Sequence, residues 1–157
     1  MYDYIVIGGG IIGVSTALSL ITKQPDKRIL LVEKEKTFAQ HQTGHNSGVI
    51  HAGVYYQPGS LKAKFCREGL KETINFCSLH QIPYQQCGKL LVATDDIELN
   101  RMNELYERCR ANEIEVEILD QNQLTEIEPN VQGIGALLVK STGIVNYKLI
   151  TNKMSEQ

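Results

Sequence analysis

Short apolar runs and longer amphipathic stretches follow one another from the first residues of the chain. Residues 2–7 form a short β-rich run that ends at three glycines, residues 8–10, which predicts a buried strand followed by a tight turn. Residues 11–22 are apolar nearly all round and contain several small residues, which predicts a helix packed closely on a sheet. Residues 28–33 predict a second buried strand, parallel to the first because the crossover is short. The opening segment therefore predicts a βαβ unit.

The rest of the chain mixes predicted helices and strands without another glycine-rich turn. A polar, glycine-dotted loop spans residues 37–60, and its last residue, Ser60, is a plausible N-cap for a helix that runs to about residue 80. Apolar side chains are spaced to cover one face of that helix: Leu61, Phe65, Leu70, Ile74 and Cys77. The pattern then predicts a strand from residue 88, a charged helix over 96–112, and strands over 115–119 and 134–140.

Composition excludes several classes of protein. The 157 residues carry a formal net charge of −2 and no basic stripe, so we expect no nucleic-acid partner. The longest apolar stretch, residues 11–21, is shorter than the roughly 20 residues that cross a bilayer, and no basic segment precedes it as in a secretion signal. We expect a cytoplasmic protein. Its four cysteines contain no C-x-x-C pair, and we expect them to be reduced and mostly buried.

The glycines carry the clearest chemical signal. Gly8, Gly10 and Gly13 have the spacing G-x-G-x-x-G between a predicted strand and a predicted helix, where the first allows a tight turn, the second a close approach to a pyrophosphate and the third close packing of helix on strand. The helix N-terminus favours an anion. Glu33, at the end of the second strand, stands where a carboxylate binds ribose hydroxyls. A turn without a ligand would not require this combination, so the sequence predicts dinucleotide binding, by either a nicotinamide cofactor or FAD.

The polar loop that follows the second strand contains three of the four histidines. His41, His45 and His51 lie among small and polar residues, an arrangement suited to wrapping a long cofactor. Their spacing of four and six residues, without a cysteine or a carboxylate nearby in the sequence, matches none of the common ligand patterns, so we expect no metal site.

Two segments indicate a family. "YDYIVIGGGIIGVSTA" followed by "TGHNSGVIHAGVYYQPGSLKAKFCREG" resembles the D-amino-acid oxidase-like superfamily of FAD-dependent oxidoreductases, and within it the L-2-hydroxyglutarate dehydrogenase/oxidase group. The resemblance extends from residue 2 to about residue 149 and includes "GKLLVAT" and "GIVNYKLI", whereas the closing "ITNKMSEQ" departs from the pattern. Glycerol-3-phosphate dehydrogenases look similar in the same region.

The resemblance implies an α/β protein that begins with a Rossmann-like FAD-binding βαβ unit of the glutathione-reductase type and continues into part of an α+β substrate domain. We expect residues 1–85 to belong to the FAD-binding domain and residues 86–157 to the substrate domain. We also expect the chain to be an N-terminal fragment, inactive in isolation, because a doubly wound sheet needs more parallel strands.

The implied cofactor is FAD, and the implied reaction is oxidation of L-2-hydroxyglutarate to 2-oxoglutarate with hydride transfer to flavin N5. Electrons would pass on to a quinone or oxygen, with possible peripheral membrane contact by the full-length protein. The residues expected to bind the cofactor are Gly8, Gly9, Gly10, Ile12, Gly13, Glu33, Lys34, Thr43, Gly44, His45, Asn46, Ser47 and Gly48.

His51 is the candidate catalytic residue, because an imidazole suits proton transfer near neutral pH. The alternative is that His51 only orders the loop or touches the flavin. Other functions left open are a glycerol-3-phosphate dehydrogenase-like or amino-acid oxidase-like flavoenzyme, a nicotinamide-dependent dehydrogenase, and an inactive dinucleotide-binding remnant.

Overall fold

The structure, a computed structural model, describes residues 1–157, which form two compact units. Unit 1 consists of residues 1–48, 75–84 and 145–157, and unit 2 consists of residues 49–74 and 85–144. The units interleave because the chain leaves unit 1 twice and returns to it twice. The division into domains 1–85 and 86–157 that we expect from the sequence stays a prediction.

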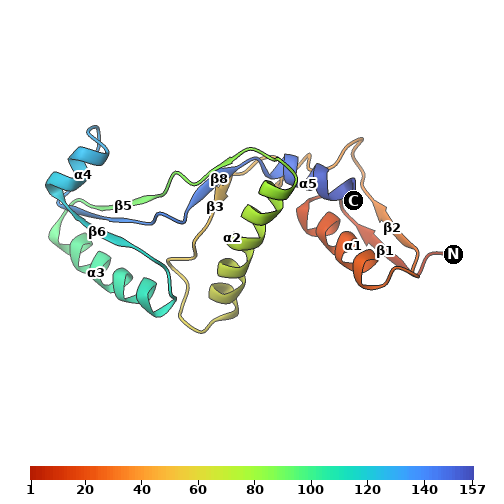
Figure 1. Cartoon of the computed structure of the whole chain (residues 1–157), viewed down its shortest axis with the longest axis horizontal. Helices are drawn as coiled ribbons and strands as arrows, with labels where there is room; N and C mark the ends of the chain where they lie inside the picture. Colours follow the sequence, from red (N-terminus) through yellow and green to blue (C-terminus); the bar gives the residue numbers. More distant parts are fainter. The chain divides into compact units, whose positions relative to one another are not determined.

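Unit 1 contains the expected βαβ arrangement. Strand β1 (Tyr4–Ile7), helix α1 (Ile11–Lys23) and strand β2 (Ile29–Val32) follow one another, and β1 pairs with β2 in parallel, from Tyr4 opposite Ile29 to Ile7 opposite Val32. Helix α5 (Tyr147–Ser155), near the other end of the chain, packs against α1 (Figure 1). The strand–helix–strand prediction is therefore confirmed.

The prediction that these two strands are buried is wrong: β1 is mostly exposed, and the residues of β2 are at most partly buried. Val6 faces Gly13 of α1, whereas Ile5 and Ile7, which point to the opposite face of the sheet, are 61% and 85% exposed. Their cross-strand neighbour Val32 is also exposed. The physical reason is that the sheet has two strands and α1 covers one of its faces, so the apolar side chains of the other face remain uncovered within the unit.

Unit 2 is built around an antiparallel sheet with the strand order β5 (Leu90–Ala93), β7 (Gly135–Leu138), β6 (Glu117–Asp120). Helix α3 (Asp96–Ala111) packs against β5 and β7, and helix α4 (Gln121–Ile127) packs against β6 and β7 (Figure 1). Successive residues of β7 alternate between two clusters, with Leu137 beside Met102 of α3 and Ala136 beside Leu124 of α4. The central strand is therefore buried on both faces.

The remaining elements are short strands and one long helix. Strands β3 (Val49–Ile50), β8 (Gly143–Val145) and β4 (Tyr84–Gln85) form a three-stranded sheet in that order. Helix α2 (Leu61–Leu79) begins after Ser60, whose hydroxyl accepts a hydrogen bond from the Ala63 N–H, so the expected N-cap is confirmed.

The apolar face expected on α2 is incomplete. Leu61 and Phe65 are more than 60% exposed, and Cys77 alone is fully buried on this helix. The four cysteines are free: Cys77 and Cys109 are buried, Cys66 is partly buried and Cys87 is exposed. The expectation of mostly buried thiols is thus wrong for Cys87. No helix combines the length and apolar character needed to cross a membrane.

Candidate cofactor-binding site

In the turn between β1 and α1, the backbone geometry requires glycine at two positions, Gly8 and Gly13. Gly8 has a φ of +109°, a left-handed conformation that side chains disfavour. A Cβ at Gly13 would overlap the carbonyl oxygen of Gly8, so α1 approaches the end of β1 more closely than any larger residue allows. Both observations agree with the roles that the G-x-G-x-x-G spacing predicts.

The first turn of α1 presents unused backbone donors. Gly10 is the N-cap residue and supplies no capping side chain, and the N–H groups of Gly10, Ile12 and Gly13 have no acceptor within the chain. The Ile11 N–H is the exception, because it donates to the Thr43 hydroxyl oxygen at 3.0 Å. Three open N–H groups at the positive end of a helix are suited to an anion such as a pyrophosphate.

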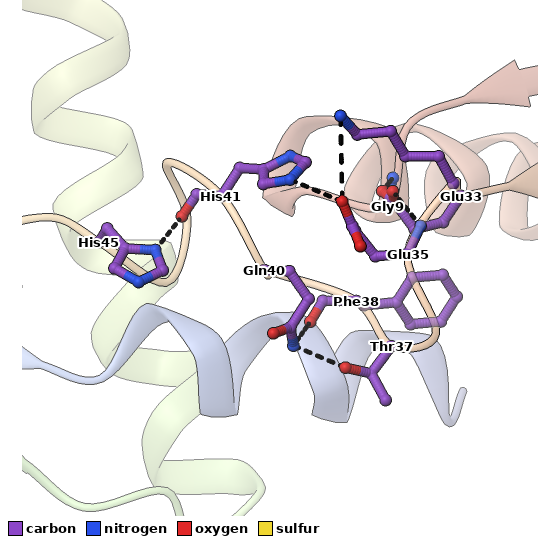
Figure 2. Close-up of polar contacts among 9 residues, drawn as sticks. Gly9, Glu33, Glu35, Thr37, Phe38, Gln40, His41 and His45 are labelled. Carbon is purple, nitrogen blue, oxygen red and sulfur yellow. Dashed lines mark hydrogen bonds and ion pairs between the residues drawn. The ribbon is translucent and has the colours of Figure 1, made fainter.

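The carboxylate of Glu33 lies beside this turn, directly after β2. One of its oxygens accepts a hydrogen bond from the Gly9 N–H at 2.6 Å, and the other accepts one from the Glu35 N–H at 3.0 Å (Figure 2). These two bonds, with the Glu35 N–H contributing most, hold the pKa of Glu33 below its ordinary value of 4.5. Glu33 is thus an ionised carboxylate with lone pairs left to accept further hydrogen bonds.

The start of the polar loop is organised around the backbone of His41. Its carbonyl oxygen accepts hydrogen bonds from the Gly44 N–H and the His45 Nδ1, both at 2.9 Å (Figure 2). The imidazole Nε2 of His41 lies 3.0 Å from a carboxylate oxygen of Glu35, a neighbour that the histidine spacing did not indicate. No group of three or more His, Cys, Asp or Glu side chains is arranged to hold a metal ion.

The end of the loop is held by Asn46. Its amide nitrogen donates to the Thr43 carbonyl at 2.8 Å, and its amide oxygen accepts from the Gly48 N–H at 2.7 Å. Ser47 and Lys34 are exposed, and the Lys34 ammonium lies 3.9 Å from the Glu35 carboxylate. The expected cofactor residues of this loop therefore lie in unit 1 together with the glycine turn, and His45 and Asn46 contribute to the shape of the loop itself.

His51 belongs to unit 2, whereas the residues described above belong to unit 1. Its side chain is exposed, and its carbonyl oxygen accepts a hydrogen bond from the Cys66 thiol at 3.2 Å. Burial raises the pKa of that thiol, so it remains a neutral donor. The catalytic role expected for His51 stays a prediction.

Sequence reasoning missed a part of the site formed by Phe38 and Ala39. The Phe38 ring lies against Gly9, where a Cβ would overlap it, and the buried Ala39 donates its N–H to the Gly9 carbonyl at 3.0 Å. Ala39 has a φ of +58°. The lone phenylalanine of this polar loop is a signal that Phe38 packs against something, but it does not indicate Gly9 as the partner.

Comparison with known proteins places the chain in a family. The model of the family described as FAD dependent oxidoreductase (DAO) matches residues 3–157. The match includes the closing segment, so the expectation that "ITNKMSEQ" departs from the family pattern is wrong.

Similar proteins include two dehydrogenases. The L-2-hydroxyglutarate dehydrogenase of Escherichia coli K12 is 57% identical over 156 residues, which are 99% of this chain and 37% of that protein. The mitochondrial L-2-hydroxyglutarate dehydrogenase of Caenorhabditis elegans is 45% identical over 99% of this chain and 36% of its own length. The chain thus spans little more than a third of the curated relatives that it matches.

Solved structures agree with this result. L-alpha-glycerophosphate oxidase from Mycoplasma pneumoniae, with FAD bound, has a TM-score of 0.88 at 29% identity and covers 99% of this chain and 41% of its own. Glycine oxidase from Geobacillus kaustophilus shares the fold, with a TM-score of 0.85 at 19% identity over 98% of this chain and 43% of its own. The chain, with its glycine turn and ionised Glu33, belongs to the DAO family of FAD dependent oxidoreductases, whose cofactor is FAD.

Proposed function

We propose that unit 1 binds the ADP portion of FAD in an enzyme that oxidises L-2-hydroxyglutarate to 2-oxoglutarate. The observation that carries the binding proposal is the pairing of three open N–H groups at the start of α1 with an ionised carboxylate at the end of β2. The substrate rests on the names of the relatives that are 45–57% identical.

The residues present fit this cofactor. The open N–H groups of Gly10, Ile12 and Gly13 would hold the pyrophosphate oxygens. A Cβ at Gly10 would lie 3.2 Å from Thr43 Oγ1, so the turn has little room for a side chain there. The remaining lone pairs of Glu33 would accept hydrogen bonds from ribose hydroxyls, as its place after the second strand predicts. The Thr43 hydroxyl, which accepts from the Ile11 N–H, keeps its own proton for a further acceptor.

In the proposed reaction, bound flavin would supply a two-electron acceptor at N5 for the hydride of the substrate α-carbon, with a quinone or oxygen as the final acceptor. We propose that the His51 imidazole accepts the proton of the substrate hydroxyl, since such a step needs a base and an imidazole nitrogen can accept a proton. The polar groups of Ser47 and Lys34 would add hydrogen bonds to the cofactor.

A second candidate is oxidation of glycerol 3-phosphate. It is favoured by the similarity to the Mycoplasma pneumoniae oxidase, which is 29% identical to this chain. In the whole protein, anaerobic bleaching of the flavin absorbance by L-2-hydroxyglutarate, glycerol 3-phosphate or glycine separates the candidates. We expect L-2-hydroxyglutarate to bleach it fastest. Faster bleaching by glycerol 3-phosphate would reverse the order of the two proposals.

The cofactor proposal is tested by titrating FAD into the protein and following quenching of flavin fluorescence. We expect Gly10→Val to weaken FAD binding about 10- to 100-fold, because the valine side chain would keep the phosphate from forming charge-assisted hydrogen bonds with the N–H groups. Gly69→Ala is the matched control, because a Cβ at Gly69 on α2 meets no other atom within 4 Å. Unchanged FAD affinity in Gly10→Val would contradict the proposal.

A further inference from the structure

We propose that the ion pair between His41 and Glu35 positions Glu33 and thereby sets how tightly the site holds a ribose. This inference rests on the proposed function, because it concerns the carboxylate to which we assign the sugar. His41 and Glu35 are positioning residues here, since neither is required to touch the cofactor.

Glu35 links the ion pair to the carboxylate. Its backbone N–H donates to Oε1 of Glu33 at 3.0 Å, and its own Oε1 lies 3.0 Å from Nε2 of His41. Figure 2 shows the two contacts on neighbouring parts of the same residue. Fixing the Glu35 side chain therefore restricts the peptide group that orients Glu33.

His41 is itself anchored. Its carbonyl oxygen accepts two hydrogen bonds, from the Gly44 N–H and from the His45 imidazole, each at 2.9 Å. The segment 35–41, which we call the clasp, is thus tied at its far end to the polar loop and closed by the ion pair between its first and last residues.

The middle of the clasp contacts the glycine turn. The Ala39 N–H donates to the Gly9 carbonyl at 3.0 Å, while the Gly9 N–H donates to Oε2 of Glu33 at 2.6 Å. The Phe38 ring lies against Gly9 on the same side of the turn. Gly9 is therefore held by the clasp through its carbonyl and by Glu33 through its N–H, so a shift of the clasp moves both partners of the Glu33 carboxylate.

The Glu35–His41 pair contributes little to the folding stability of unit 1. The side chains of Glu35 and His41 are 41% and 55% exposed, and exposed ion pairs contribute little to folding stability because water screens them. The Lys34 ammonium, 3.9 Å from the same oxygen of Glu35, is the other charged group beside the pair. Without His41 the Glu35 carboxylate would keep only the contact with Lys34. Because Lys34 is adjacent to Glu35 in the sequence, that contact cannot link the two ends of the clasp.

The first test is FAD affinity. We expect His41→Ala and Glu35→Gln each to weaken FAD binding about 2- to 5-fold, the effect of one exposed ion pair. The double variant should bind no more weakly than either single variant, because both remove the same contact. His41→Gln, which keeps a donor, should recover part of the loss. Lys27→Ala, which removes an exposed ion pair with Asp3 elsewhere in unit 1, is the matched control and should bind FAD like the wild type.

The second test needs no cofactor. The amide proton of Gly9 should resonate far downfield in a ¹⁵N-correlated NMR spectrum because it is bonded to a carboxylate, and Glu33→Gln should shift it upfield. We expect His41→Ala to shift it in the same direction and Lys27→Ala to leave it in place. A Gly9 resonance unmoved by His41→Ala would overturn the inference, as would additive losses of FAD affinity in the double variant. Two outcomes separate this inference from the proposed function. If the wild-type protein binds no FAD, the proposed function fails. If Glu33→Gln weakens FAD binding and His41→Ala does not, this inference alone fails.

Discussion

The β5–β7–β6 sheet of unit 2 and the glycine turn of unit 1 are held together by different interactions. In the sheet, Leu137 and Ala136 are fully buried, as is Leu124 of the covering helix α4, and apolar contacts dominate. Around the turn, Ile7 and Ile12 are 85% and 77% exposed, and the backbone is fixed by hydrogen bonds from polar side chains.

The difference follows from what each region presents to its surroundings. A sheet with helices on both faces can bury every side chain of its central strand. A turn that offers its N–H groups to a ligand must leave that side open, so it has few apolar contacts and correspondingly low local stability. The turn has few packing contacts, so we infer that binding of the cofactor stabilises it.

The largest expected effect is on the buried sheet. Leu137→Ala should lower the free energy of unfolding by about 2–5 kcal/mol, because it leaves a cavity between β7 and α3. Ile7→Ala, the control in unit 1, should change it by less than about 0.5 kcal/mol, since that side chain is already in water. Urea denaturation of both variants measures the difference. Equal losses would show that the face of β1 is covered in the protein.

The next effect is on backbone packing at the turn. Gly13→Ala should lower the free energy of unfolding by about 1–3 kcal/mol and weaken FAD binding, because the new Cβ overlaps the Gly8 carbonyl and forces α1 away from β1. Gly69→Ala, in open space on α2, should instead stabilise the protein by about 0.5–1 kcal/mol. A neutral Gly13→Ala would contradict the close approach of helix and strand.

Two helix N-termini extend the comparison. Asp120 caps α4 in a capping box with Gln123, whereas α1 begins at Gly10 without a capping side chain of its own. Asp120→Ala should therefore cost about 1 kcal/mol of stability, measured by thermal or urea unfolding, while Asp120→Asn should keep most of it. A loss as large in Asp120→Asn as in Asp120→Ala would mean that charge rather than the hydrogen bond matters.

The smallest effect is a dependence on pH. The folded-state pKa of Glu33 lies below 4.5, so its hydrogen bonds stabilise the protein above that pH, and the contribution is lost as the pH falls through the lower folded value. The difference in urea midpoint between wild type and Glu33→Gln should be present at pH 7 and shrink below pH 4.5. A difference that persists below the folded pKa would contradict the ionised carboxylate.

Much of the fold could be predicted because its periodic segments are long or well bounded. Helices α1, α2 and α3 begin within a residue of their expected starts, and their N-terminal signals, such as Ser60, are local. Helix α4 was missed because seven residues show little periodicity, although Asp120 and Gln123 form a recognisable capping box. Strands β3, β4 and β8 are two or three residues long and depend on pairing between distant segments.

The site divides in the same way. The glycine spacing and the position of Glu33 at the end of a strand could be predicted, because both follow from the order of elements along the chain. The contacts of Gly9 with Phe38 and Ala39, and of His41 with Glu35, could not. They depend on how one loop folds back, which includes a left-handed backbone at Ala39 that no local signal indicates.

The packing of α5 on α1 has a consequence for biosynthesis. Helix α1 leaves the ribosome early, whereas the segment that covers it is translated after nearly all the other elements described here. The residues of β5, α3, β6 and β7 are all synthesised in between and make contacts nearer in sequence, which favours their earlier assembly. The β1–α1–β2 segment would then be among the last parts of this polypeptide to mature, and a nascent chain stalled before residue 147 would display an unshielded α1 to chaperones.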